Sequence, residues 1–164
     1  MTFTNDLAIG RRAEKEFAKV LLDNTEEFRV VSLEFAQGKF KDWDIKIDCI
    51  PDWILTYEIK SDTMADKTWN FVIEFRGNKW NASWIYASKA DYIVYYVKWE
   101  WWIQERGELI LRLINTEKEE VMGGDGKLTS MWKIKCTELP NLFSKIKTNG
   151  QRGEETTEGT GEAG

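Results

Sequence analysis

The chain has 164 residues, of which 42% are hydrophobic and 31% charged, a composition that favours one globular domain and excludes a wholly disordered chain. It contains no histidine, which excludes histidine-based catalytic triads, histidine-ligated zinc and imidazole general bases. The formal net charge is -5, and an acidic C-terminal tail contributes to it, so the body of the chain can still carry a basic face for nucleic acid.

The sequence has no apolar run long enough for a transmembrane helix and no secretory signal at its beginning. We therefore expect a cytoplasmic protein without a membrane contact, located in the host cytoplasm if the source is viral. Cys49 and Cys136 form no metal-ligand pattern, and buried thiols in a reducing compartment explain them. The small size fits a phage, viral or prokaryotic source.

The first predicted element is a helix that starts at Asn5 or Asp6, both good N-cap residues, and runs to about Asn24. Its apolar residues recur at helical spacing: Ala13, Phe17, Val20 and Leu21.

Six segments rich in β-branched, aromatic or alternating apolar residues are predicted as strands: 28–35, 42–50, 53–60, 70–76, 91–98 and 131–137. The segment 91–98 is nearly apolar throughout, which is typical of a central strand covered on both faces. Shorter helices are predicted over three segments: 81–90, 104–115 and 139–146. The element order indicates an α/β fold, with a mixed central β-sheet flanked by helices, in one domain spanning 1–147. A disordered tail is predicted over 148–164.

Acidic residues on two successive predicted strands can approach each other. Glu58 and Lys60 share one face of their strand because strand side chains alternate. Asp44 lies on the preceding strand and comes near Glu58 if the two strands pair as a hairpin across Pro51. Neighbouring carboxylates repel, so they need a cation or a shared proton between them, and Mg²⁺ prefers oxygen ligands. Lys60 can then orient or deprotonate a water molecule, or neutralise charge on a phosphate.

Glu14 adds a third acid from the first helix. It lies about 60° around the helix from Phe17, on the margin of the apolar face, if each residue turns the helix by about 100°. An acid at that margin needs a partner, and the predicted metal site offers one.

Several alternatives remain open at this stage. Asp42 shares a face with Asp44 and competes with it for the strand acid, and Asp44-x-Lys46 competes with Glu58-x-Lys60. We favour Glu58 because the strand before it is more apolar. Glu74 is a candidate extra acid. Solvated strand faces also carry alternating Glu and Lys without any function, and a helix acid such as Glu14 is often part of an ion pair.

At these positions the sequence resembles the PD-(D/E)XK nuclease superfamily. The motifs that carry the resemblance are Gly10-Arg-Arg-Ala-Glu14, Asp42-Trp-Asp44-Ile and Tyr57-Glu58-Ile-Lys60-Ser. Their spacing is most similar to small members, such as archaeal Holliday junction resolvases and compact viral or phage nucleases. Trp43 stands where the family name has a proline.

The resemblance implies a restriction-endonuclease-like fold and a Mg²⁺-dependent endonuclease that hydrolyses DNA phosphodiester bonds, with Holliday junctions and other branched DNA among its expected substrates. It assigns metal binding to Glu14, Asp44 and Glu58 and places Lys60 with them in catalysis, with Mn²⁺ able to replace Mg²⁺. Small members of the family are often homodimers, which we also expect here.

Five further residues are candidate contacts to the DNA backbone, although ordinary structural roles explain them equally well: Arg11, Arg12, Ser61, Ser83 and Lys89. The aromatic cluster over 92–102 is expected to serve the core or, above all, a dimer contact. The alternative function is a non-catalytic nucleic-acid-binding or viral interaction protein on the same fold.

Overall fold

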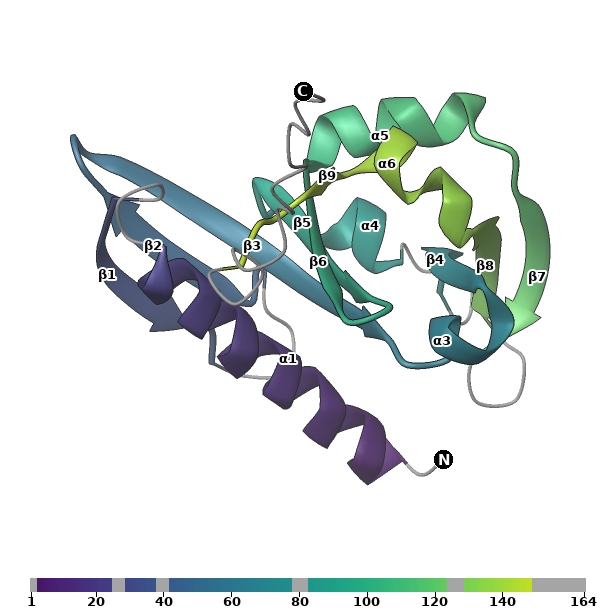
Figure 1. The fold of residues 1–164 in the computed structure, drawn as a ribbon, viewed down its shortest axis with the longest axis horizontal. Coiled ribbons are helices and arrows are strands. Elements are labelled where there is room, and N and C mark those ends of the chain that lie inside the picture. Colours follow the sequence, from purple (N-terminus) through teal and green to yellow (C-terminus); the bar gives the residue numbers. More distant parts are fainter. Residues whose placement is uncertain (1–2, 25–28, 38–41, 78–82, 124–128, 149–164) are drawn as a thin grey trace, which may run out of the picture.

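The structure, a computed structural model, describes residues 3–24, 29–37, 42–77, 83–123 and 129–148 (Figure 1). Its helices are α1 (Phe3–Asp23), α3 (Ala65–Thr68), α4 (Trp84–Ala87), α5 (Arg106–Asn115) and α6 (Leu139–Leu142), with a 3-10 helix at Cys136–Glu138. Its strands are β1 (Val30–Phe35), β2 (Ile45–Cys49), β3 (Trp53–Asp62), β4 (Asn70–Arg76), β5 (Tyr92–Val97), β6 (Glu100–Glu105), β7 (Glu119–Gly123), β8 (Thr129–Lys135) and β9 (Ser144–Lys145). Residues 149–164 of the predicted tail lie outside the described ranges.

Six strands form a mixed sheet in the order β1-β2-β3-β5-β6-β9. Within it β3 and β5 are parallel, and the other neighbouring strands are antiparallel. The predicted mixed central sheet with flanking helices is therefore confirmed. The segments 70–76 and 131–137 were expected in that sheet, but β4 and β8 pair with each other and with β7 in a separate three-stranded sheet.

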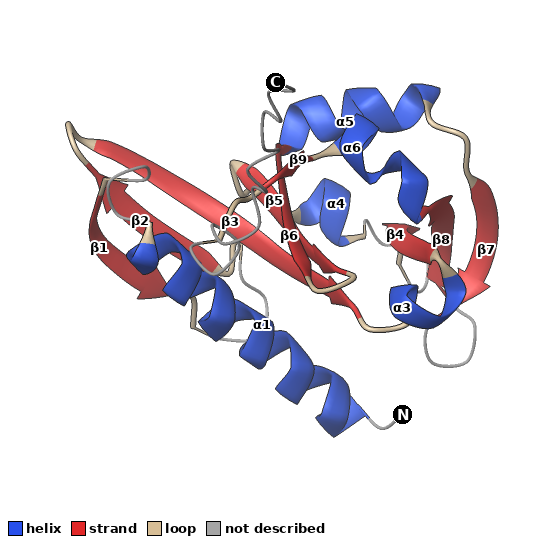
Figure 2. Ribbon diagram, in the orientation of Figure 1, coloured by secondary structure: helices blue, strands red, loops and turns tan. Residues whose placement is uncertain are grey.

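Helix α1 lies across one face of the six-stranded sheet (Figure 2). Of its predicted apolar residues, Ala13, Phe17 and Leu21 are buried there and Val20 is half-buried. The centroid of the Phe17 ring lies 5.6 Å from that of Tyr57 and 5.2 Å from that of Trp101. The helix begins at Phe3, earlier than the predicted caps at Asn5 and Asp6. The 3.6-residue periodicity thus identified the helix and its buried face, while the local capping signal misplaced its first turn.

The opposite face of β5 and β6 packs against α4, α5, α6 and the three-stranded sheet. Strand β5 contributes to both cores, since Ile93 faces this second core and Val94 faces the core under α1. The predicted doubly covered strand is thereby confirmed. The β1–β2–β3 part of the sheet extends beyond the second core, so the molecule is elongated in Figure 1.

The aromatic residues of 92–102 serve mainly these two cores. Tyr95, Trp101 and Trp102 are buried within the chain, whereas Trp99 at the β5–β6 turn is 77% exposed. The expectation that this cluster chiefly forms a dimer contact is corrected accordingly, because most of its apolar surface is already covered by the chain's own elements. None of the described helices has the length and apolar content that crossing a membrane requires.

Candidate functional site

Strand β3 separates its side chains between two environments. Tyr57 and Ile59 belong to the core beneath α1, so the alternating residues Glu58 and Lys60 point to the opposite face of the sheet. There the Lys60 ammonium Nζ lies 2.5 Å from Glu58 Oε1. The predicted pair on one face of a strand is therefore present, and it forms a direct ion pair.

Asp44 enters the same region from the residue just before β2. Its side chain is only 3% exposed, and its Oδ2 accepts a hydrogen bond of 2.7 Å from the Ile59 backbone N–H. The Asp44 N–H donates to the Tyr57 carbonyl at 2.8 Å. Just before β2 begins, the Asp44 carboxylate thus accepts a β3 backbone N–H in place of a backbone carbonyl of the sheet. This hydrogen bond fixes the orientation of the carboxylate beside Glu58.

Glu58 is 7% exposed, and its burial raises the pKa of its carboxyl above the ordinary value of 4.5. The negative charge of Asp44 raises this pKa further, while the nearby Lys60 ammonium lowers it. Burial and the second carboxylate together outweigh the lysine. A bound cation would offset the same repulsion, and hard carboxylate oxygens are ligands that Mg²⁺ prefers, so this donor set fits the predicted ion.

The segment after α4 supports the site from a distant part of the chain. The Ser88 hydroxyl lies 3.3 Å from Glu58 Oε2 and 3.2 Å from the Asp42 carbonyl, and it accepts the Ala90 N–H. The Lys89 N–H also donates to the Asp42 carbonyl, at 2.9 Å. Sequence reasoning missed Ser88, because a serine that precedes a strand has no distinguishing signal until the fold brings it to Glu58.

Lys60 also faces the three-stranded sheet. Its ammonium lies 5.2 Å from the centroid of the Trp84 ring, and its charge lowers the pKa of Glu74 on β4. Burial is the larger effect, so the Glu74 pKa is raised overall, and Thr129 on β8 hydrogen-bonds to this carboxyl. Glu74, a candidate extra acid in the sequence, is therefore a neighbour of Lys60 contributed by the second sheet.

Glu14 is half-buried on α1, as its helical position predicted. However, the inward side of α1 packs against the face of the sheet that carries Tyr57 and Ile59, whereas Glu58 and Lys60 point to the other face. Within the described ranges no three Asp, Glu or Cys side chains are grouped closely enough to hold a metal ion. The structure thus brings Asp44, Glu58 and Lys60 together, and the contribution of Glu14 stays a prediction.

Asp42, the competitor of Asp44, is exposed and pairs with Lys89 through an Oδ2–Nζ distance of 3.0 Å. Asp44 is therefore the acid that neighbours Glu58. Lys46, from the competing Asp44-x-Lys46 pattern, pairs with Glu34 on β1 at 2.9 Å. The structure favours Glu58-x-Lys60 over that pattern.

The candidate DNA contacts have different surroundings. Ser83 is buried and donates to the Glu74 carbonyl at 2.5 Å, which gives it a role inside the fold. Ser61 is half-buried on β3, and Lys89 is exposed in its ion pair with Asp42. Arg11 and Arg12 are exposed on α1, where Arg12 Nε lies 2.7 Å from Glu16 Oε1. DNA contact by these residues stays a prediction.

No known protein-family model matches the chain, and no curated protein sequence is similar to it. Among solved structures, the fold is similar to that of a bacterial homing endonuclease at 14% sequence identity and a TM-score of 0.46. The similarity covers 96% of this chain and 86% of that one.

Proposed function

We propose that this protein is a metal-dependent endonuclease that hydrolyses DNA phosphodiester bonds. The observation that supports the proposal is the buried carboxylate Glu58, which has both a second carboxylate, Asp44, and the Lys60 ammonium beside it. A buried acid whose pKa is raised by a neighbouring acid is typical of a functional site rather than of a solvated strand face.

In this proposal Asp44 and Glu58 hold Mg²⁺ or Mn²⁺. When bound, the ion polarises the scissile phosphate and makes a water molecule more acidic. The Ile59 N–H keeps Asp44 oriented, and Ser88 does the same for Glu58. Lys60, an ammonium next to Glu58, donates hydrogen bonds to the attacking water or to a phosphate oxygen as negative charge develops there.

The finer parts of the proposal concern the substrate and the assembly. We propose DNA as the partner, with branched substrates such as Holliday junctions tested first, and a homodimer as the active species. Both follow from the resemblance of Glu58-x-Lys60 and its neighbours to small nucleases of the PD-(D/E)XK superfamily.

Metal binding is tested without any nuclease assay by thermal unfolding at increasing Mg²⁺ or Mn²⁺ concentration. An ion that binds only the folded protein raises the Tm as its concentration increases. We expect such a rise for the wild type and its loss in Asp44→Asn and in Glu58→Gln. An unchanged metal response in both variants would refute the assignment of these carboxylates.

Catalysis is tested by cleavage of linear, circular and branched DNA in the presence of Mg²⁺. Asp44→Asn and Glu58→Gln should abolish cleavage, and Lys60→Ala should reduce it by about 10²-fold or more. Lys133→Ala is the control, because Lys133 also forms an ion pair with a glutamate, but in the second sheet, where its partner Glu119 lies on the neighbouring strand. Full cleavage by a folded Glu58→Gln variant would contradict the proposal.

A non-catalytic nucleic-acid-binding protein is the second candidate. The observation that favours it is that both carboxylates already have partners within the chain, since Lys60 pairs with Glu58 and the Ile59 N–H donates to Asp44. This candidate requires DNA binding that is independent of Mg²⁺, no metal effect on the Tm and no cleavage of any substrate.

A further inference from the structure

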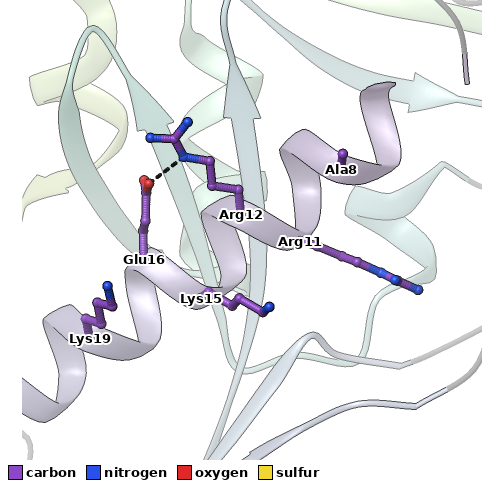
Figure 3. Close-up of a pocket in the computed structure, with 6 residues that line it drawn as sticks. All are labelled: Ala8, Arg11, Arg12, Lys15, Glu16 and Lys19. Carbon is purple, nitrogen blue, oxygen red and sulfur yellow. Dashed lines mark hydrogen bonds and ion pairs between the residues drawn. The ribbon is translucent and has the colours of Figure 1, made fainter. Parts of the chain in front are cut away.

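The outer face of α1 carries two parallel rows of side chains, each with a spacing of four residues. One row is Ala8, Arg12 and Glu16, and the other is Arg11, Lys15 and Lys19. Side chains four apart lie one above another on a helix, so the rows form two ridges with a groove between them. This groove is open, has a volume of about 360 Å³ and is drawn in Figure 3.

The two rows differ in their charge balance. Arg12 leans onto Glu16 and forms an ion pair of 2.7 Å, while Arg11 and Lys15 point away from that pair in Figure 3. Arg11, Lys15 and Lys19 are exposed, and no described carboxylate lies within ion-pair distance of them. The row therefore presents three positive charges that the described part of the chain does not neutralise, in a protein whose net charge is -5.

The spacing of the row suits a regular polyanion. Residues four apart rise by about 6 Å along the helix axis, so the three cations extend over about 12 Å. One strand of duplex DNA places a phosphate every 3.4 Å or so along its axis, so a row of about 12 Å passes about four successive phosphates, at least one for each cation. Ala8 adds no bulk to the groove beside the row, which leaves room for a phosphate group.

We infer that Arg11, Lys15 and Lys19 bind the sugar–phosphate backbone of DNA without sequence preference, on the side of the sheet opposite to Glu58 and Lys60. The choice of DNA as partner rests on the proposed function. A membrane surface fits less well, because the apolar side of α1 is already buried against the sheet and cannot insert into lipid. The row is a second contact with the substrate, separate from the proposed reaction centre.

The test measures binding of the full-length protein to a duplex of random sequence, in EDTA, at several salt concentrations. The variant is Arg11→Gln combined with Lys15→Gln and Lys19→Gln, because glutamine keeps the helix propensity at these exposed positions. Each lost phosphate contact lowers the slope of log K against log salt by about 0.9, so we expect a decrease of up to about 2.7. Over the decade from 1 M to 0.1 M salt, this decrease raises the Kd by up to about 500-fold relative to the wild type.

The matched control removes three exposed lysines that lie elsewhere: Lys67→Gln, Lys135→Gln and Lys147→Gln. It changes the net charge almost equally, so a similar loss of affinity in both triple variants would show general charge attraction and overturn the inference. The single variant Lys15→Gln repeats the test with one substitution. It should weaken binding more than Arg12→Gln, because Arg12 is already paired with Glu16.

Two further results separate this inference from the proposed function. In an Asp44→Asn or Glu58→Gln background, the triple substitution of the row should lower the salt slope in EDTA as much as it does in the wild type, since the row lies apart from these carboxylates. If the protein cleaves no DNA but its binding depends on Arg11, Lys15 and Lys19, the proposed nuclease function is refuted and the inferred DNA contact stands. Absence of DNA binding by the wild type would overturn the inference. It would also be overturned if the triple variant kept its DNA binding and lost only binding to phosphatidylserine vesicles.

Discussion

Asp44 stabilises the fold because its side chain accepts a hydrogen bond from the backbone. The Ile59 N–H donates to Asp44 Oδ2 in a buried position. Asp44→Ala would leave this N–H without its acceptor and should lower the free energy of unfolding by about 1–3 kcal/mol. Asp44→Asn keeps an oxygen in place and should cost less. Denaturant unfolding of both variants measures the difference, and equal losses would show that the bond contributes nothing.

The pKa of Glu58 makes stability depend on pH in a definite direction. Since this pKa is raised above 4.5, the folded protein binds more protons than the unfolded chain in the interval just above pH 4.5. The free energy of unfolding contributed by Glu58 is therefore largest below pH 4.5 and decreases as the pH rises through the raised pKa. Burial also raises the pKa of Glu74, so the contribution of Glu74 to the free energy of unfolding decreases with rising pH in the same way.

Glu58→Gln removes this titration, so we expect its Tm to fall less than that of the wild type as the pH rises above 4.5. Thermal unfolding of both proteins over a pH series without divalent ions measures the two slopes. Parallel slopes would mean that Glu58 has the same pKa in the folded and unfolded chain.

For single residues of the candidate site, the sequence predicted only the positions that strand alternation and turns between neighbouring strands determine. Side-chain alternation placed Glu58 and Lys60 together, and the turn at Pro51 brought Asp44 to them through the β2–β3 pairing. Ser88 and Glu74 reach the site from other elements. Glu74 was a candidate extra acid, but no spacing in the sequence placed it beside Lys60, and Ser88 was not predicted at all. The position of Glu14 relative to a face of the sheet likewise depends on packing rather than on helical periodicity.

At the scale of elements, the clearest omission is β6. It follows β5 through a tight turn in which Lys98 and Trp99 both have left-handed backbone angles, with φ of 53° and 66°. Asn-Gly or Asp-Gly normally marks such a hairpin turn. Because Lys98 and Trp99 carry no such signal, the segment 100–105 was not predicted as a strand, and the helix expected from 104 begins at Arg106.

This turn therefore offers a stabilising substitution. A left-handed conformation costs a residue with a Cβ about 1 kcal/mol or more, and glycine avoids the cost. Trp99 is mostly exposed, and its described ring contact is an edge contact with Tyr96 at 6.5 Å. We expect Trp99→Gly to raise the free energy of unfolding by about 0.5–1 kcal/mol in denaturant titrations. A loss of stability would show that the indole packs more strongly than its exposure indicates.

For the whole molecule, strand periodicity identified the segments but not their partners. The alternation in 70–76 is the same whether the strand joins the central sheet or a second one, because both options bury one face. The second sheet contributes Glu74 to the environment of Lys60, and helix α4 contributes Trp84. The proposed reaction centre thus combines residues from two sheets, although its charged pair, Glu58 and Lys60, can be recognised on one strand.

The elongated shape leaves apolar side chains at the outer end of the β1–β2–β3 part, where Figure 1 shows it projecting from the rest. Four exposed residues lie at that end: Val31, Ile50, Trp53 and Ile54. Exposed apolar groups that cluster in this way often mark a protein contact. Trp101 and Trp102 are buried within the chain and cannot form the proposed dimer interface. We therefore expect the exposed apolar side chains at this end of the sheet to form it.

Sedimentation of the wild type should therefore give a mass of twice 19.2 kDa, and the double variant Trp53→Ser with Ile54→Ser should sediment as a single chain. The matched control is Leu111→Ser with Ile114→Ser, an equally exposed apolar pair on α5, which should remain dimeric. If only the α5 variant dissociated into single chains, the dimer interface would lie on α5 instead. A wild type that sediments as a single chain at all concentrations would exclude the homodimer, and each chain would then have to cleave DNA with its own Asp44, Glu58 and Lys60.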